Sequence, residues 1–352
     1  MKRRSFLKFV GGVAGSAAAA GINSVIDPSA AAPVIADGTG MPRRALGRTG
    51  LKVSIVGFPG FSLKQESQER CTAAVHEAFK RGVNYFDVAP AYANGECENK
   101  LGVALQGLDR SVYHLACKTK MRDADGCRVE LERSLQRLKT EYFDVYQLHH
   151  LVQPADVKKA LAPGGAMEAI LKAKEQGKVR FIGFSAHTTK AAVAALMSFP
   201  FDTVMFPINY VEYFNRAFGK EVLDVAQEKG AGVLAIKPMN AGLPKPGEAL
   251  KHKWWYRTLE DQEEINMAWR FTLSLPGVGT GFSPAWLDLA EKAINAGYAY
   301  RPITESEIKK LMQMAEGQGS IFKREEDSVA LNRRFDSPYP HHPHECDAAM
   351  WG

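Results

Sequence analysis

The chain has 352 residues, of which 45% are hydrophobic and 24% are charged. This is the composition of an ordinary globular protein, and it excludes a disordered or fibrous chain. The formal net charge is +6, but the first 32 residues contribute +3 of it, through Lys2, Arg3, Arg4 and Lys8 against Asp27. The remaining +3 forms no basic cluster, so a nucleic acid is not expected as a partner, whereas a small anionic molecule would suit it.

The chain begins with a basic head and a short apolar stretch, MKRRSFLKFVGGVAGSAAAAG, a pattern typical of a secretory signal. The segment RRSFLK at residues 3–8 resembles the twin-arginine export signal, with Lys2 in place of the usual Ser or Thr. The apolar run of residues 9–21 is shorter than the ~20 residues that a membrane-spanning helix needs. We therefore expect a twin-arginine signal over residues 1–32, cleaved near residues 30–32. The mature protein is then expected in the periplasm, exported by the twin-arginine machinery and without a membrane span.

The cysteines indicate neither a zinc site nor an iron–sulfur cluster, because their number is odd and no C-x-x-C spacing occurs. They are Cys71, Cys97, Cys117, Cys127 and Cys346. One disulfide would be compatible with an oxidising compartment, but the spacing selects no pair. Further possible metal ligands gather near the end of the chain, at His341, His342, His344 and Cys346. Prolines interrupt this tail, which therefore supplies no fixed ligand geometry, and we expect no metal.

From residue 41 onward, short β-rich runs alternate with segments of helical periodicity at a steady interval. This alternation predicts βα units and a parallel sheet. The runs are expected to end near Phe58, Asp87, Lys118, His149, Ser185, Asn209, Lys237 and Gly281. Eight units over residues 41–300 match the ~250 residues of a (β/α)8 TIM barrel, an α/β fold. A doubly wound open sheet is the main alternative, but no G-x-G-x-x-G follows any predicted strand.

Three segments fall outside the regular units. The stretch RRALGRTGLKVS predicts a β-hairpin, with a turn at Thr49-Gly50, that plugs the bottom of the barrel. The segment around Trp254-Trp255 predicts an inserted loop before the last strand. Residues 301–352 are expected to form a C-terminal helix, TESEIKKLMQMAEG, and an irregular tail, DSPYPHHPHECDAAMWG.

Polar residues close three successive predicted strands. These are Asp87, Lys118 and His149, and Tyr92 follows in the loop after Asp87. In a (β/α)8 barrel the active site lies at this end of the strands. A tyrosine hydroxyl, with a pKa near ~10, is a weak acid at neutral pH, but a neighbouring ammonium favours its ionised form. Lys118 would supply that charge, Asp87 would hold Lys118, and His149 would align a carbonyl oxygen. Each residue alone also has a structural interpretation, such as a salt bridge at the barrel mouth.

Four stretches together resemble the aldo-keto reductase superfamily, over residues 41–300. RRALGRTGLKVSIVGFPG, NYFDVAPAYANGECENKLG, ACKTK and YFDVYQLHHL are similar to its opening hairpin, Asp and Tyr segment, lysine strand and histidine strand. The resemblance implies Tyr92 as proton donor, tuned by Lys118 and Asp87, with His149 orienting the carbonyl. It also implies an NAD(P)H-dependent oxidoreductase that reduces a small aldehyde or ketone, or oxidises the alcohol. It favours NADP(H) over NAD(H), bound in an extended pose across the barrel mouth.

The resemblance also implies residues that bind the cofactor. They are Ser185, Asn209, Lys237, Pro238, Gly281, Phe282 and Ser283. Lys237 is interpreted either as a phosphate contact or as a solvated lysine. The chain departs from the family pattern at Ala186, where Asn is usual, at Met205, where Gln is expected, and at Ile236, where a stacking Tyr is common.

Two other functions stay open at this point. The departures at three cofactor positions are compatible with a barrel that binds nicotinamide without rapid turnover. A metal-dependent hydrolase built on Asp87, His149 and His150 is the second, but it lacks the ligands at other strand ends that such a site needs. The physiological substrate and the oligomeric state are not predicted.

Overall fold

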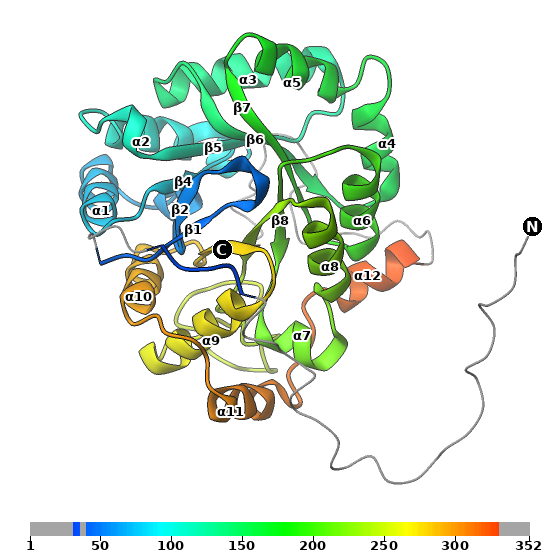
Figure 1. Ribbon diagram of the computed structural model, residues 1–352. Helices are drawn as coiled ribbons and strands as arrows, with labels where there is room; N and C mark the ends of the chain where they lie inside the picture. The colour runs from blue at the N-terminus through cyan, green and yellow to red at the C-terminus, as the bar shows by residue number, and fades with distance from the viewer. Residues whose placement is uncertain (1–30, 36–39, 331–352) are drawn as a thin grey trace, which may run out of the picture.

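A closed barrel of eight parallel strands forms the centre of the molecule in the computed structural model, which describes residues 31–35 and 40–330 (Figure 1). The strands follow one another around the barrel in chain order, and the last pairs with the first. They are β3 (Val56–Pro59), β4 (Tyr85–Asp87), β5 (His114–Thr119), β6 (Phe143–Leu151), β7 (Val179–Ala186), β8 (Thr203–Pro207), β9 (Gly232–Ile236) and β10 (Val278–Phe282). The predicted α/β barrel is therefore confirmed, and the open doubly wound sheet is excluded.

Helices surround this barrel on the outside (Figure 1). They are α1 (Gln68–Lys80), α2 (Glu96–Ala104), α3 (Ala124–Leu138), α4 (Pro154–Leu161), α5 (Ala166–Glu175), α6 (Thr189–Ser198), α7 (Tyr210–Arg216), α8 (Lys220–Lys229), α9 (Gln262–Ser274), α10 (Leu287–Tyr298), α11 (Glu305–Ala315) and α12 (Lys323–Ala330). Short 3-10 turns precede or follow several of them: η3 (Gly47–Thr49), η4 (Gly60–Leu63), η5 (Tyr92–Gly95) and η6 (Arg110–Val112).

Helix α1 illustrates how the sequence builds one unit. The Ser67 side chain accepts a hydrogen bond from the Arg70 amide and caps the first turn. Cys71, Val75 and Ala78 follow at helical spacing and are buried against the sheet. None of the helices in the described residues is long and apolar enough to cross a membrane.

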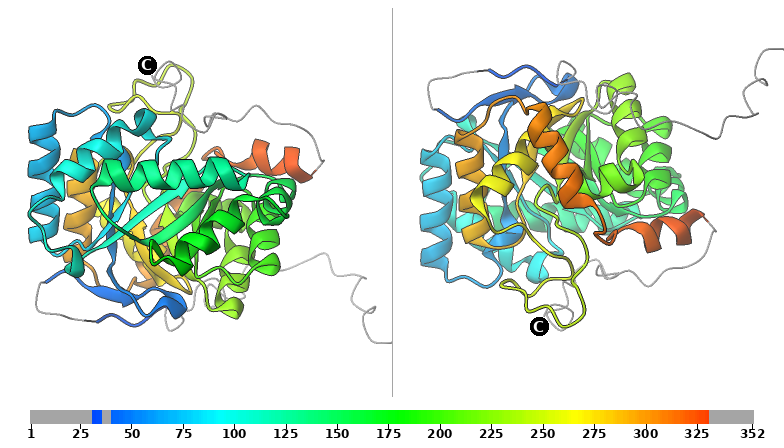
Figure 2. Two further views of the ribbon diagram at one scale, coloured as in Figure 1. Left: turned by 90° about the horizontal axis from the view of Figure 1, so that it is seen from above. Right: turned by 90° about the horizontal axis from the view of Figure 1, so that it is seen from below.

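The bottom of the barrel is closed by the predicted hairpin, β1 (Arg43–Ala45) and β2 (Lys52–Ser54), whose strands pair antiparallel. Leu46 and Val53 of this hairpin join the apolar cluster that fills the barrel. Gly50, at the expected turn, has φ 71, a conformation that glycine adopts without strain. Figure 2 shows the hairpin (blue) and the loop between β9 and α9 (yellow-green) at opposite ends of the barrel.

Side chains along each strand point alternately into the barrel and outward, and the inward-pointing ones become polar toward the mouth. Tyr85 and Ala116 belong to the buried interior cluster. Because side chains on a strand point to one face at every second position, Asp87 and Lys118 lie above them on the same interior face. The polar residues that close the predicted strands therefore end up together at one end of the barrel.

The C-terminal part contains more structure than expected. Helix α11 was predicted, but α12 was not, and it packs against α6. The Glu212 carboxylate in α7 accepts hydrogen bonds from Ser320 Oγ and the Ile321 amide, both at 2.6 Å. Glu326 in α12 accepts one from the Thr189 amide, also at 2.6 Å. These contacts carry the chain back beside the barrel mouth.

Two expected segments lie outside the described residues. One is the export signal, except for Ala31 and Ala32 at its end, and the other is the tail with its three histidines and Cys346. The loop expected around Trp254-Trp255 is present, and it runs from Lys237 to Asp261 without a helix or strand.

Candidate active site

The four candidate catalytic residues meet at the barrel mouth. Lys118, which has no exposed surface, forms an ion pair with Oδ1 of Asp87 across the β4–β5 boundary. Its Nζ atom also lies 3.3 Å from the Tyr92 hydroxyl and 3.2 Å from the Val88 carbonyl oxygen. The Tyr92 ring meets the His149 ring edge to face, with centroids 5.7 Å apart. The residues singled out at the ends of three strands and in one loop therefore lie together in the fold.

A tight turn returns Tyr92 to the mouth. Ala93 and Asn94, directly after it, have φ values of 49° and 53°, in the left-handed region that non-glycine residues rarely adopt. Gly95 completes the turn with φ 85, a conformation in which a side chain would be strained, and a Cβ there would lie 1.9 Å from the Arg137 guanidinium. Strained backbone of this kind persists only where the surroundings enforce it, and it is commonly found at functional sites.

The electrostatics give Lys118 and His149 opposite protonation states. Burial by itself would lower the pKa of Lys118, but the charges of Asp87 and Tyr92 outweigh it and raise that pKa above its ordinary value. The pKa of His149 is lowered well below its usual range by burial and by the neighbouring cations, Lys118 first among them. At neutral pH the site thus holds an ammonium beside Tyr92 and a neutral imidazole.

Two supporting residues were not predicted. Gln147 Nε2 donates a hydrogen bond of 3.2 Å to Oδ2 of Asp87, on the carboxylate side that Lys118 leaves open. Arg122 Nη2 donates to the His149 carbonyl oxygen at 2.7 Å. Gln147 was detectable in principle, since it lies two positions before His149 on the same face of β6. No local pattern marks Arg122.

A single cavity opens above these residues. Asp87, Tyr92 and His149 form part of its wall, and Lys118 lies just beneath. Aromatic side chains make much of the remaining wall: Phe61, Trp254, Trp255, Tyr256 and Phe282. Basic side chains make another part: Lys120, His150, His187 and Lys237. The cavity wall therefore combines aromatic with basic side chains.

A comparison with family models matches residues 56–265, more than half of the chain, to the aldo/keto reductase family. The chain belongs to the aldo/keto reductase family. Members of this family are oxidoreductases that use nicotinamide cofactors. The matched residues include all four candidate catalytic positions.

Curated aldo/keto reductase relatives are moderately similar. An L-galactose dehydrogenase from Arabidopsis thaliana is 32% identical over 57% of this chain and 66% of its own length. A D-threo-aldose 1-dehydrogenase from a Pseudomonas species is 24% identical over 62% of this chain and 76% of its own. The alignment thus spans just under two thirds of the first of these relatives. The holo structure of an aldo-keto reductase from Bacillus halodurans superposes with a TM-score of 0.63 at 23% identity, covering 80% of this chain and 98% of the other. That likeness concerns the fold.

The positions that the aldo/keto reductase resemblance assigned to the cofactor divide into residues that line the cavity and residues that do not. Ser185, Lys237, Phe282 and Ser283 line the cavity, as do the departures Met205 and Ile236. Asn209, Pro238 and Gly281 are not among its lining residues. Asn209 is 1% exposed and caps α7 by accepting from the Glu212 amide at 3.0 Å. Gly281 faces Trp269, 3.0 Å from where a Cβ would be.

The chemistry of the lining set fits a nicotinamide nucleotide. Ser185 Oγ accepts from the His150 amide at 2.8 Å and keeps its own proton for a carboxamide oxygen. Lys237, whose pKa is lowered by burial to about 7, supplies an ammonium for a phosphate when it is protonated. Ser283 lies shortly before α10, whose N-cap residue Trp286 makes no side-chain cap. A helix N-terminus favours a nearby anion, although the Leu289 amide of this first turn already donates to Oδ1 of Asp288. Three hydrogen-bonding groups therefore lie in or beside the cavity wall: the Ser185 hydroxyl, the Lys237 side chain and the start of α10.

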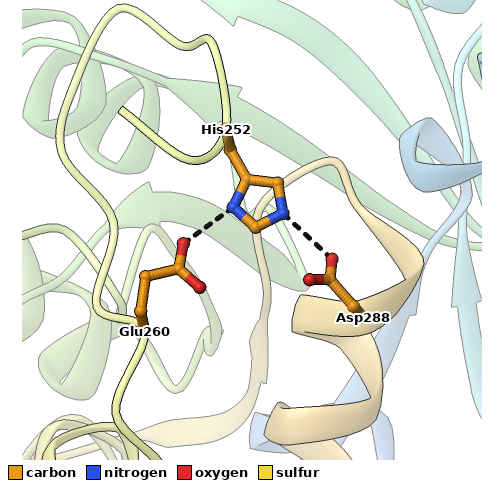
Figure 3. Close-up of side chains that lie close together, drawn as sticks. All are labelled: His252, Glu260 and Asp288. Carbon is orange, nitrogen blue, oxygen red and sulfur yellow. Dashed lines mark hydrogen bonds and ion pairs between the residues drawn. The ribbon is translucent and has the colours of Figure 1, made fainter. Parts of the chain in front are cut away.

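A separate cluster, not anticipated from the sequence, fastens the 237–261 loop to α10. His252 lies between two carboxylates, with Nδ1 2.7 Å from Glu260 and Nε2 3.1 Å from Asp288 (Figure 3). The Lys251 ammonium contacts both carboxylates as well, at 3.4 and 2.9 Å. His252, Glu260 and Asp288 are of metal-ligating types and lie close together. However, the two ring nitrogens face different carboxylates and a lysine already neutralises them, so we interpret the cluster as an ion-pair network.

Proposed function

We propose that this protein transfers a hydride between a nicotinamide cofactor and a small carbonyl compound or the corresponding alcohol, with Tyr92 as the proton donor or acceptor. The observation that carries the proposal is the Tyr92 hydroxyl 3.3 Å from the buried, paired Lys118 ammonium, beside His149, in the wall of a cavity. Family membership supports the same reaction class.

The side chains divide the work as follows. The Lys118 ammonium favours the ionised form of Tyr92, so the hydroxyl can release its proton to a carbonyl oxygen that gains negative charge. Asp87, held by Gln147, keeps Lys118 charged and oriented. Neutral His149 donates an N–H to the same oxygen and fixes its position. The bound cofactor supplies the hydride.

We propose NADP(H) as the cofactor, following the family preference, with NAD(H) as the alternative. Ser185, Lys237 and Ser283 are the residues that we expect to hold it. Met205 and Ile236 would give the nicotinamide ring an apolar surface in place of the usual Gln and Tyr. Binding of both nucleotides by calorimetry would measure the preference directly.

Sugars are the first substrates to test. Two of the similar proteins are named as an L-galactose dehydrogenase and a D-threo-aldose 1-dehydrogenase. Aromatic rings such as those of Trp254 and Trp255 pack well against the apolar face of a sugar ring. We propose aldoses and simple aldehydes as the starting panel.

The test is the rate of NADPH and NADH oxidation over this carbonyl panel, and of the reverse reaction, for the native protein and Tyr92→Phe. We expect the variant to lose about 10² to 10⁴-fold in kcat, the usual contribution of general acid catalysis, with nucleotide affinity unchanged. Tyr298→Phe, on the exposed surface of α10, is the matched control and should be fully active. Equal rates for native protein and Tyr92→Phe would overturn the assignment.

A nicotinamide-binding barrel with slow turnover is the second candidate, favoured by the unusual residues Met205 and Ile236 in the cavity wall. Single-turnover hydride transfer to a reactive aldehyde separates the two. A rapid first turnover supports the reductase, and tight binding without transfer supports the alternative. For the hydrolase built on Asp87, His149 and His150, the described residues form no metal-ligand cluster at the barrel mouth.

A further inference from the structure

Strand β6 is irregular at the candidate catalytic histidine. Its pairing with β7 shifts register between Leu148 and Leu151, three positions along β6 against two along β7. His149 and His150 therefore lie opposite the single residue Ser185, which is the arrangement of a β-bulge. A regular strand turns neighbouring side chains to opposite faces, but here both histidines line the cavity. The geometry of the bulge thus determines how His149 is presented to the carbonyl.

The bulge places His150 in a strained backbone conformation. Its φ is 60, in the left-handed region that residues other than glycine rarely adopt. Strain of this kind persists only where neighbouring contacts enforce it, and it is common at functional sites. A bulge also disrupts the ladder of hydrogen bonds, so its main-chain groups need partners from elsewhere. The contacts made with the bulge therefore decide whether it keeps its shape.

Arg122, in the loop after β5, makes two of these contacts. Its Nη2 atom donates hydrogen bonds to the carbonyl oxygens of His149, at 2.7 Å, and His150, at 3.3 Å. Its Nη1 atom lies within hydrogen-bond distance of the carbonyl oxygens of residues 119–121, in its own segment. From the neighbouring strand, the Ser185 hydroxyl accepts a hydrogen bond from the His150 amide at 2.8 Å. The guanidinium thus joins the ends of β5 and β6.

The shape of a guanidinium suits this place. Its donors form a rigid planar fork, so one nitrogen can serve each strand end at the same time. A lysine ammonium would be a compact point charge on a flexible stem, without this fork. The five acceptors of Arg122 are all main-chain oxygens, so the side chain acts as a bracket for the backbone.

Through the bulge, Arg122 acts on the side chain that we expect to orient the carbonyl. The His149 ring meets the Tyr92 ring edge to face, with centroids 5.7 Å apart, and both residues line the cavity. Burial lowers the pKa of His149 well below its usual range, and Lys118 and Arg122 are among the cations that add to this. Because a displacement of about 1 Å can cost about 10²-fold in catalysis, a loose bulge would be felt directly.

We propose that Arg122 is a positioning residue of the reaction, which holds the bulge at His149 and His150 and so keeps the His149 imidazole directed at the carbonyl. The proposal rests on the proposed function, in which His149 donates a hydrogen bond to the reacting oxygen. Without the bracket the strained backbone relaxes and the imidazole loses its fixed direction. The cost therefore falls on kcat, whereas nucleotide affinity changes little.

A double-mutant cycle tests whether Arg122 acts through His149. Arg122→Met alone is expected to lower kcat about 10 to 100-fold, with the nucleotide Kd within about twofold of native. In a His149→Asn background the same change should have almost no further effect on kcat, because the group that Arg122 positions is already gone. Arg128→Met, at an exposed position of α3, is the matched control and should leave kcat unchanged. Effects that multiply in the double variant overturn the proposal, and so does a fully active Arg122→Met.

Chemical rescue separates the fork of the guanidinium from its charge. In Arg122→Ala, added guanidinium should restore part of the lost kcat, whereas methylammonium, which carries the same charge on one nitrogen, should not. Arg122→Lys is expected to stay impaired for the same reason. The proposal fails if guanidinium gives no more rescue than methylammonium, or if Arg122→Lys is fully active.

A spectroscopic readout does not depend on turnover. In NMR titrations of the native protein, the His149 imidazole should stay neutral through the usual range of a histidine, as its lowered pKa requires. His149→Asn identifies its signal. In Arg122→Met the ring should titrate at higher pH, because a neighbouring cation is lost and the bulge opens to water. An unchanged titration in Arg122→Met overturns the proposal.

The two kinds of readout distinguish this inference from the proposed function. Carbonyl reduction that Arg122→Met leaves intact would remove the inference and keep the proposed function. A native protein that reduces no carbonyl, but whose His149 titration shifts in Arg122→Met, would refute the proposed function and leave the bracket in place.

Discussion

At the residue scale, Lys237 combines an unusual backbone with an unusual environment. Its φ is 63, in the left-handed region, and its Nζ atom lies 5.7 Å from the ring centroid of Trp255 and 5.5 Å from that of Phe322. Burial lowers the pKa of Lys237 to about 7, and the charge of Glu325 opposes this only in part. The side chain therefore changes its charge within the physiological pH range.

This shift predicts a pH-dependent affinity for the cofactor. Below pH 7 the free site holds the ammonium, and above it the neutral amine, so anion binding weakens as the pH rises through 7 and continues to weaken up to the pKa of the complex. We expect the Kd for NADH to rise about tenfold between pH 6 and 9, the contribution of one charge-assisted hydrogen bond. NADH is the appropriate probe, because its pyrophosphate bridge keeps a constant charge over this range.

Fluorescence titrations at several pH values measure this dependence. Lys237→Met should bind NADH more weakly at pH 6 and show a nearly flat profile, converging with the native protein at high pH. A native Kd that stays constant from pH 6 to 9 would show that Lys237 does not contact the cofactor.

The sequence indicated some of these residues for a simple reason. Asp87, Lys118 and His149 each end an apolar run, a signal that lies within a few neighbouring positions. Gln147 and Arg122 act through contacts between different strands. Gln147 shares only the two-residue alternation with His149, and nothing in its own segment distinguishes Arg122 from an ordinary polar residue. Asn209 ends an apolar run in the same way, but its side chain caps the next helix.

At the scale of elements, the 237–261 loop supplies Trp254, Trp255 and Tyr256 to the cavity wall. It has no helix or strand of its own, so its position depends on contacts with neighbouring segments. The network of His252, Glu260 and Asp288 is one of its contacts with α10 (Figure 3). We infer that this network sets how firmly the aromatic wall is held.

Asp288→Asn tests the role of this network. The change weakens the contacts with Lys251 and His252, each of which is partly exposed and individually small. We expect hydrogen exchange in residues 245–260 to become about five times faster and substrate KM to rise by a similar factor, with kcat little changed. Asp224→Asn, in the exposed Lys220 pair on α8, is the matched control and should change neither quantity. Unchanged exchange in Asp288→Asn would mean that the aromatic wall is held elsewhere.

Helix α12 was not predicted from the sequence. Its segment, KREEDSVA, is mostly charged or polar, and Val329 and Ala330 are the apolar residues that it contains. What holds it is tertiary: Phe322, just before it, stacks on Phe218 with centroids 5.0 Å apart, and Glu326 binds the first turn of α6. By contrast, helices such as α1 carry apolar residues at regular helical spacing, and the helices predicted from that spacing are present in the structure.

At the scale of the whole molecule, the described N-terminal residues lie at the end of the barrel opposite the cavity. Ile35 pairs with Arg43 of the hairpin through backbone hydrogen bonds of 2.7 and 3.0 Å, and Ala31 bridges to Pro276. Figure 2 shows this hairpin end and the 237–261 loop on opposite sides.

The described cysteines are compatible with an oxidising compartment. Cys71, Cys97, Cys117 and Cys127 are all buried, and no disulfide joins any two of them. Burial raises the pKa of the Cys127 thiol to about 12 and that of Cys117 well above its ordinary value. Because the thiolate is the reactive form, these side chains are protected from oxidation and disulfide exchange while the barrel is folded.

These features lead to a prediction about export. The twin-arginine pathway accepts folded proteins, and the periplasm does not regenerate nicotinamide cofactors as the cytosol does, so we propose that the barrel folds around its cofactor before it crosses the membrane. Replacing both Arg3 and Arg4 by Lys should keep the precursor in the cytoplasm, whereas Ser5→Ala, within the same segment, should leave export unchanged. Fractionation and N-terminal sequencing of the exported form measure both effects.

The exported protein should carry about one nicotinamide nucleotide per chain, seen by absorbance after acid release. Periplasmic protein that has no nucleotide and no affinity for one would refute the idea, and export of the Lys-Lys precursor would refute the route.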